Sequence, residues 1–293
     1  MTTIPTFALN DGSSVPAIGF GTYPLRGREG TDATLSAIDA GYRLIDTAVN
    51  YRNEDAVGAA VRETDVPRDE LVVATKLPGR DHGFEETITS CRGSLASLGL
   101  DHIDLYLIHW PNPSVGRFVE SWKAMIQLQR EGLVRSIGVS NFTEEFLTRL
   151  ADETGVLPAV NQVELHPYFP QEELLAFHRE HGIVTEAWSP LGKAQAPFAE
   201  ESVAAAAAAH DVSPAQVASA GTTSAACSRS RSPRPRNASA RTSTSSASSS
   251  ATPRCKRSPH SGGPTAGSST ATPTPTRRCE SRRARPRARR HPS

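Results

Sequence analysis

The sequence predicts an α/β fold, a (β/α)8 barrel that lacks its last strand and helix. Short apolar runs of strand length alternate with longer amphipathic segments, which is typical of βαβ units and a parallel sheet. Seven such units precede a point near Ala218 where the apolar residues stop. Strands are expected at 18–21, 44–45, 71–75, 103–109, 134–139, 160–163 and 183–188, and helices at 31–40, 53–64, 84–98, 117–131, 143–153, 171–181 and 199–210.

The N-terminal segment predicts a β-hairpin, because Asn10-Asp11-Gly12 separates two short strand-like runs. A doubly wound sheet is the alternative to a barrel. Its first strand would be followed by G-x-G-x-x-G. Here the stretch from Gly19 to Pro24 lacks the third glycine and places a proline where that helix should begin. The barrel is therefore favoured.

The charge divides the chain into two parts. The 293 residues carry a net charge of +1, but the segment from Ser219 onward holds 15 Arg, one Lys and a single acid, Glu280. The segment before it holds 16 basic and 30 acidic residues. From Ser219 there is no Ile, Leu, Val, Met, Phe, Tyr or Trp, so that segment is predicted to be disordered. We expect a barrel over 1–218 and an Arg/Ser/Pro-rich tail over 219–293.

The sequence predicts a cytoplasmic protein without a membrane segment. Met1 to Asn10 has neither a basic start nor an apolar stretch of signal-peptide length. The most apolar runs, such as 104–110, have the length of strands and are too short to span a bilayer. Cys91 is the single cysteine of the first part, so no disulfide framework is expected.

Four side chains at the ends of consecutive predicted strands predict a catalytic site. They are Asp46, Tyr51, Lys76 and His109. In a barrel, the carboxyl ends of the strands carry the active site. Alone, each residue has an ordinary interpretation, as a helix cap, a packing residue, a solvated lysine or a core histidine. Their occurrence together at three neighbouring strand ends favours one shared site.

The motifs around these residues resemble the signatures of the aldo-keto reductase superfamily. They are the stretch Gly41-Tyr-Arg-Leu-Ile-Asp46-Thr-Ala-Val-Asn-Tyr51, the lysine at 76 and the stretch Ile103-Asp-Leu-Tyr-Leu-Ile-His109-Trp110-Pro111. The resemblance runs from the hairpin to about Ala218 and is nearest to bacterial enzymes of the 2,5-diketo-D-gluconate reductase type. It implies an NADPH-dependent oxidoreductase that reduces aldehydes, ketones or keto-sugars, with the four residues as its catalytic tetrad.

The implied chemistry suits these residue types. Reduction of a carbonyl places negative charge on its oxygen, so a proton donor such as Tyr51 must lie within reach. The ammonium of Lys76 would lower the pKa of that phenol, and Asp46 would keep the lysine charged. A neutral His109 would orient the carbonyl. Tyr23 and Trp110 are candidate walls of the substrate pocket, although ordinary aromatic packing would explain them equally well.

The resemblance also implies the residues that contact the cofactor. Polar side chains after the fifth and sixth strands suit the nicotinamide carboxamide, an aromatic ring after the seventh suits stacking, and small residues beyond it suit the pyrophosphate. No metal site is expected, the partner is a small-molecule carbonyl compound, and a monomer is expected. The predicted cofactor residues are Gly21, Thr22, Asp46, Ser140, Asn141, Gln162, Trp188, Ser189, Leu191 and Gly192.

The tail departs from the family pattern. That pattern continues with an eighth strand ending in I-P-K-S and a following R-x-x-E-N, which bind the 2′-phosphate of NADPH. When Ser219 to Thr242 is read from one nucleotide earlier, one permitted translation is L-R-W-H-H-L-S-G-V-L-P-I-P-K-S-A-T-P-E-R-Q-R-E-N. Codon choice alone does not force this result, because the first base of each codon becomes the middle base of the shifted codon. We therefore hypothesise a frameshift near Ala218.

Two other interpretations of the chain stay open. Its basic tail could bind nucleic acid without sequence specificity through phosphate contacts, although it lacks aromatic residues for base stacking. A barrel without the residues that bind the 2′-phosphate could also be a relic that binds a cofactor but does not catalyse a reaction. In either case the missing strand leaves two unpaired sheet edges, and the exposed core is expected to cost more than the roughly 5–15 kcal/mol of a typical domain's stability.

Overall fold

The computed structural model describes residues 4–192, 198 and 200–227. The chain begins with the predicted hairpin, in which β1 (Thr6–Ala8) and β2 (Ser14–Pro16) pair in antiparallel fashion. Leu9 and Val15 are buried in one cluster with residues of the central strands, including Leu105. The hairpin therefore packs against the sheet and extends its core.

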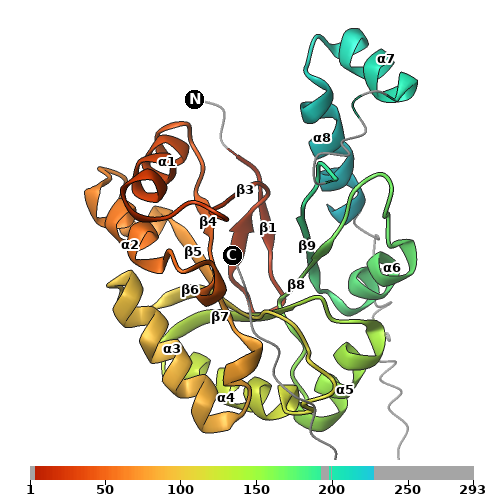
Figure 1. The fold of residues 1–293 in the computed structure, drawn as a ribbon. Coiled ribbons are helices and arrows are strands. Elements are labelled where there is room, and N and C mark those ends of the chain that lie inside the picture. Colours follow the sequence, from red (N-terminus) through yellow and green to blue (C-terminus); the bar gives the residue numbers. More distant parts are fainter. Residues whose placement is uncertain (1–3, 193–197, 199, 228–293) are drawn as a thin grey trace, which may run out of the picture. The chain divides into compact units, whose positions relative to one another are not determined.

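Seven parallel strands form one sheet in sequence order, so each strand pairs with the next along the chain (Figure 1). This order is the one expected for a barrel built from successive βα units. The predicted strand positions agree with the structure to within a few residues. The strands are β3 (Gly19–Gly21), β4 (Leu44–Asp46), β5 (Val72–Leu77), β6 (Ile103–Ile108), β7 (Val134–Ser140), β8 (Val160–Glu164) and β9 (Val184–Trp188).

Helices follow the strands and cover the outer face of the curved sheet (Figure 1). Neighbouring helices from α1 to α5 contact one another in chain order. The first helix begins at Gly27, before the expected start at 31. The helices are α1 (Gly27–Asp39), α2 (Glu54–Glu63), α3 (Phe84–Leu98), α4 (Phe118–Arg130), α5 (Glu144–Thr154), α6 (Glu172–His181), α7 (Glu201–His210) and α8 (Pro214–Cys227).

The main core lies between the sheet and the outer helices. All six residues of β6 are buried, as expected for a central strand covered on both faces. From the helical side, Phe118 and Trp122 of α4 are almost completely buried in the same core. Burial of such large rings contributes on the order of 2–3 kcal/mol each, which fixes the helix on the sheet.

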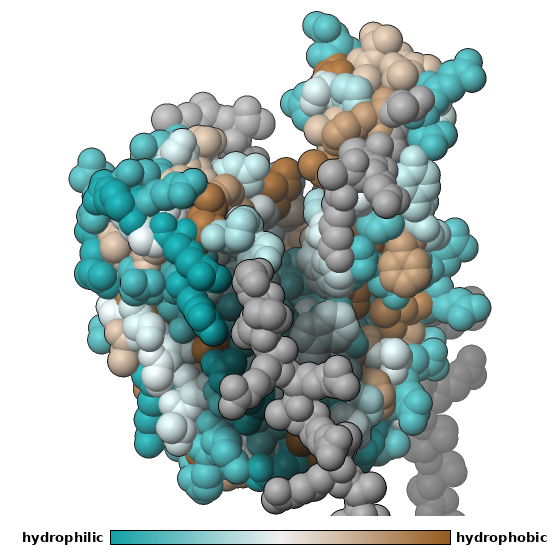
Figure 2. All heavy atoms as spheres, viewed as in Figure 1, coloured by the Kyte–Doolittle hydropathy of each residue, from teal (hydrophilic) through white to brown (hydrophobic). Residues whose placement is uncertain are grey.

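The described sheet is open between β3 and β9. Each of these two strands pairs with one neighbour, and within the described ranges no strand joins them. A closed barrel of this kind needs eight strands. The fold is thus the predicted barrel without its eighth strand. In Figure 2, hydrophilic side chains cover the outer helices in view, whereas apolar ones gather near β3 and along α7 and α8.

The last two helices come after β9 in the chain. Helix α8 contacts β9 and α7. A capping box sets its start, because Gln216 Oε1 accepts from the Ser213 backbone N–H at 2.8 Å and Ser213 Oγ accepts from the Gln216 N–H at 3.3 Å. The helix continues to Cys227 and so crosses the predicted boundary between Ala218 and Ser219. The rest of the predicted tail, 228–293, lies outside the described residues.

Candidate active site

Lys76 is the central group of the predicted tetrad. It ends up fully buried in β5, with Nζ at 2.6 and 2.7 Å from the two carboxylate oxygens of Asp46 and 2.9 Å from the backbone oxygen of Thr47. Burial acts to lower the pKa of Lys76, but the charges of Asp46 and Tyr51 outweigh it and the pKa is raised. The side chain is therefore an ammonium at neutral pH.

Tyr51 comes from the short 3-10 turn Val49–Tyr51 that follows β4. Its hydroxyl lies 3.5 Å from Lys76 Nζ, and the ammonium lies 5.1 Å from the ring centroid. Burial raises the pKa of Tyr51 and Lys76 opposes this, with the net pKa above its usual value of 10.0. Lys76 thus acts in the expected direction, but burial outweighs it. The phenol therefore keeps its proton at neutral pH.

His109 follows β6 and faces the same tyrosine. The two rings are 5.9 Å apart between centroids and nearly perpendicular. Burial, together with the charge of Lys76, lowers the pKa of His109 to about 4, so the imidazole is neutral at pH 7. Within the described part of the chain, its Nδ1 is buried without a hydrogen-bond partner. The four predicted residues therefore lie together at the carboxyl ends of β4, β5 and β6, which we call the mouth of the barrel.

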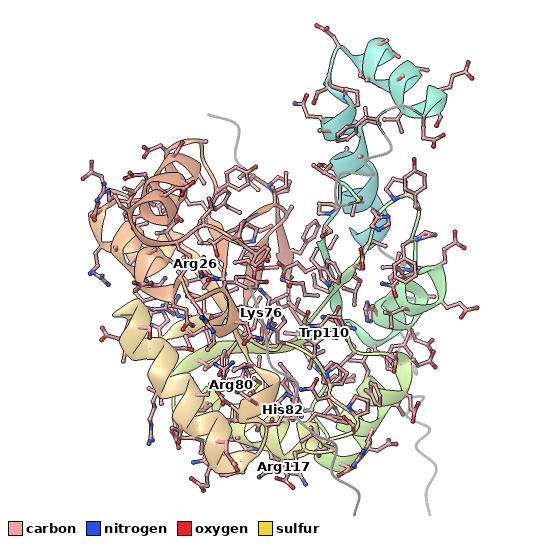
Figure 3. The ribbon with its side chains drawn as sticks, in the orientation of Figure 1. Arg26, Lys76, Arg80, His82, Trp110 and Arg117 are labelled. Atoms are coloured by element: carbon pink, nitrogen blue, oxygen red, sulfur yellow. The ribbon has the colours of Figure 1, made fainter. Side chains whose placement is uncertain are left out.

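Tyr23 and Trp110, the two predicted substrate residues that are aromatic neighbours of the tetrad in sequence or in space, are both exposed. The Tyr23 ring lies 5.3 Å from that of Tyr51 between centroids, and Tyr23 is 68% exposed. Trp110, the residue after His109, is 49% exposed. In Figure 3, the labels of Lys76 and Trp110 both lie in the central part of the view, inside the arc of outer helices. Such exposed rings are available to contact a substrate.

Three predicted cofactor residues form one hydrogen-bond network. Asn141 Oδ1 accepts from Trp188 Nε1 at 2.9 Å, while its Nδ2 donates to the His109 backbone oxygen at 3.1 Å and to Ser140 Oγ at 3.0 Å. Asn141 adopts a left-handed φ of 63°, a conformation that costs energy in a non-glycine residue and is common at functional sites. The network fixes the edge of the half-buried Trp188 ring.

The end of β3 is tied to the tetrad. The backbone N–H and hydroxyl of the buried Thr22 both donate to the Asp46 backbone oxygen, at 3.0 and 3.1 Å. A Cβ added to Gly21 would meet nothing within 4 Å, so the space beside it is open. Both predicted cofactor residues of the first strand therefore lie next to Asp46.

The predicted pyrophosphate residues lie at the end of the first described range, which stops at residue 192. Ser189 has a left-handed φ of 50°, and its backbone oxygen accepts from the N–H of Gly192 at 2.9 Å. Leu191 lies within this turn. From Phe198 to Cys227 the described residues include no Lys or Arg. The described site thus fits the nicotinamide end of a cofactor. The described residues between Phe198 and Cys227, however, include no lysine or arginine side chain that could bind a 2′-phosphate.

Sequence reasoning missed two supporting side chains. The buried Asn53 donates to the backbone oxygens of Thr22 and Leu25 and accepts from the Thr47 hydroxyl, so it links the loops after β3 and β4. Glu186 in β9 accepts from Gln162 Nε2 at 2.8 Å. The signal for Glu186 was a lone acid within the apolar run 183–188. Asn53 gave no comparable signal, because asparagine is common before a helix.

The tetrad lies apart from two other hollows of the molecule. One, of about 700 Å³, is a shallow hollow on the outside of α5. The other, of about 580 Å³, lies between the hairpin and the amino ends of the strands. No predicted site residue lines either hollow. The predicted site residues therefore lie at the carboxyl ends of the strands, where barrels carry their active sites.

Comparison with known proteins agrees with this geometry. Residues 17–220 match the model of the Aldo/keto reductase family. The chain belongs to the aldo/keto reductase family. The family match ends close to the predicted boundary at Ala218. Among curated members, 2,5-diketo-D-gluconic acid reductase B of Corynebacterium sp. (strain SHS752001) is 61% identical over 217 residues, covering 74% of this chain and 78% of that protein.

Solved structures of the family share the fold. An aldo/keto reductase from Brucella melitensis is 46% identical with a TM-score of 0.71, covering 74% of this chain and 83% of that one. An aldo-keto reductase from Bombyx mori, solved in complex with NADP, is 35% identical with a TM-score of 0.68, covering 74% of this chain and 80% of that one.

None of the described helices is long and apolar enough to cross a membrane.

Proposed function

We propose that the chain is built to reduce aldehydes, ketones or keto-sugars with NADPH, with Tyr51 as the proton donor. The observation that carries this proposal is the position of Lys76 Nζ, which contacts both Asp46 and the Tyr51 hydroxyl. An ion pair of this kind, buried at the mouth of a barrel, is costly for folding and is explained by chemistry.

Each side chain has a defined part in the reaction. When bound, the cofactor supplies a hydride to the carbonyl carbon. As negative charge develops on the carbonyl oxygen, Tyr51 donates its phenolic proton to it. The Lys76 ammonium stabilises the phenolate that remains, and Asp46 keeps the lysine protonated. The neutral His109 donates an N–H to the carbonyl oxygen and orients it.

Charged residues at the rim of the site support a proposal for the substrate class. The relative from Corynebacterium is named for a keto-sugar acid, 2,5-diketo-D-gluconic acid. In this chain, the exposed Arg26 donates to the Tyr51 backbone oxygen at 3.0 Å and the exposed Arg80 to Asn50 Oδ1 at 2.9 Å. Two guanidinium groups thus hold the turn that carries Tyr51. We propose that they favour an anionic carbonyl substrate.

We also propose that the complete protein is encoded in a shifted frame after Ala218. Continued beyond Thr242, the same frame permits V-D-V-F-G-F-E-L-S-D-A-A-V-Q-A-I for 243–258, a pattern with the apolar residues that the tail lacks. The nucleotide sequence across Gln216 to Thr242 tests this, and an independently confirmed uninterrupted frame would refute it. A cytoplasmic, monomeric enzyme is part of this proposal, and the buried free thiol of Cys91 is compatible with it.

The second candidate function is a cofactor-binding relic whose basic tail binds nucleic acid without specificity. The observation in its favour is the absence of Lys and Arg from the described residues after Phe198. NADPH fluorescence titration beside a carbonyl-reduction assay distinguishes the two: the relic binds without turnover.

The Tyr51→Phe variant tests the catalytic assignment. It removes the acidic proton and preserves the ring, so we expect turnover to fall by about 10²-fold or more, in the range of lost general acid catalysis. NADPH binding should change little, because the hydroxyl faces the carbonyl. Both the chain as given and a chain translated in the shifted frame should be assayed. Retained turnover in the variant would refute the role of Tyr51.

A further inference from the structure

Glu186 is an acidic group at the active-site mouth that the proposed mechanism does not use. It lies opposite Gln162 in the register of β9 and β8. Its Oε1 accepts a hydrogen bond from Gln162 Nε2 at 2.8 Å. Its Oε2 is shielded from solvent and has no hydrogen-bond partner among the described residues. A carboxyl group in this condition costs folding energy, which calls for a functional reason.

The contact with Glu186 decides which end of the Gln162 amide faces the site. An ionised carboxylate has only acceptors, so the amide must turn its NH2 group toward it. The carbonyl oxygen of Gln162 is then left as the free end, and the described residues donate no hydrogen bond to it. A free acceptor suits the NH2 group of a nicotinamide carboxamide. A protonated Glu186 could instead donate to the amide oxygen, and the amide could then adopt either orientation.

Burial and the neighbouring groups together bring the ionisation of Glu186 into the neutral range. The titratable groups around it are Asp46 at the end of β4, Lys76 of β5 and Tyr51 of the turn that follows β4. Burial, and then the charge of Asp46, raise the pKa of Glu186 to about 7, against the opposing charge of Lys76. Because the pKa is raised, the carboxyl is protonated below pH 7 and ionised above it.

We propose that Glu186 is a positioning residue that fixes the orientation of the Gln162 amide for nicotinamide binding, and that protonation of Glu186 releases this orientation. The inference rests on the proposed function, because it concerns the same cofactor. It adds a pH-dependent control of cofactor affinity at a residue that is not one of the four predicted tetrad residues. The turnover rate at saturating cofactor should depend on Glu186 much less than the cofactor affinity does.

The test compares full-length wild type with Glu186→Gln, and uses Glu164→Gln on β8 as the matched control. NADPH dissociation constants are measured by fluorescence from pH 6 to pH 8.5. We expect the wild-type constant to rise about tenfold more than that of Glu186→Gln as the pH falls, the equivalent of about one hydrogen bond. The comparison with Glu186→Gln is needed because the 2′-phosphate of NADPH itself titrates near pH 6 and changes the affinity of both proteins. Glu164→Gln should behave as wild type.

A second measurement needs no cofactor. Infrared spectra should show a protonated carboxyl band that disappears between pH 6 and pH 8 in wild type and in Glu164→Gln, but is absent from Glu186→Gln. An identical pH dependence of affinity in wild type and Glu186→Gln, or an unchanged carboxyl band, would overturn the inference. Either of these two results would leave the proposed function intact, provided that Tyr51→Phe still loses turnover. Retained turnover in Tyr51→Phe with the expected Glu186 behaviour would refute the function alone.

Discussion

The single residue that most shapes the site is Lys76. Its fully buried ammonium forms an ion pair with Asp46, whose side chain is 14% exposed. Removing both charges from water costs several kcal/mol, and the attraction between them only partly offsets this cost. The pair therefore does little for stability. Its effect is to hold a cation beside Tyr51, while burial keeps the phenol protonated.

Arg26 and Arg80 give a prediction at this scale. Replacing either with Gln should raise KM for an anionic 2-keto acid about two- to fivefold and leave KM for its neutral amide unchanged, since exposed charges contribute about 0.5–1 kcal/mol. Arg26→Lys should preserve most of the preference because it preserves the charge. Steady-state kinetics with the matched pair of substrates measure this. An equal loss for both substrates would show that the arginines act on the turn alone.

The elements are held by close packing between helices and sheet. In α2, a Cβ placed on Gly58 would lie 1.9 Å from the backbone oxygen of Leu98, at the end of α3. The same oxygen accepts from Arg62 Nη1 at 2.8 Å. Any larger residue at position 58 must push the two helices apart. The site depends on this packing indirectly, because α2 follows directly after the loop that carries Tyr51.

Gly58→Ala should therefore destabilise the α2–α3 contact by about 1–3 kcal/mol, the usual cost of overpacking. Amide hydrogen exchange in α2 and α3 should accelerate about tenfold or more. Gly93→Ala is the matched control, because a Cβ there meets nothing within 4 Å and alanine favours a helix over glycine by about 0.5–1 kcal/mol. Slower exchange in Gly58→Ala would contradict the packing argument.

At the scale of the whole molecule, the chain combines an acidic barrel with a basic tail. The described sheet ends at β3 and β9 without a strand between them. Unpaired strand edges are templates for association, and we expect apolar positions that an eighth strand and its helix would cover to be exposed. We therefore expect the departure from the family to lower the stability of the barrel and to weaken cofactor binding.

Comparing the chain as given with the chain translated in the shifted frame tests this consequence. The given chain should bind a hydrophobic dye and associate on heating. The shifted-frame chain should unfold in one cooperative transition and bind NADPH more tightly. Calorimetry, light scattering and fluorescence titration measure these properties. A monomeric, cooperative thermal transition in the given chain would contradict the prediction that its barrel is damaged.

The sequence by itself determined the order of the elements and the barrel, and it predicted that the four tetrad residues would lie together. Alternating apolar runs and amphipathic segments depend on local periodicity, and residues at strand ends must meet when parallel strands form a sheet in chain order. Asp46 and Lys76 could be paired on that basis alone. The extension of α8 to Cys227 was missed, because small residues give a helix no apolar stripe to detect.

Only the tertiary structure decided the protonation states and the orientation of the polar groups. The pKa of Tyr51 reflects a balance between burial and the nearby charge of Lys76. Neither the degree of burial nor the distance to that charge can be obtained from the sequence. The alignment of Gln162 with Glu186 depends on the register of β8 and β9. The close contact between Gly58 and Leu98 likewise depends on helix packing. Periodicity places residues on a face, whereas distances and solvent exclusion exist only after the elements have packed.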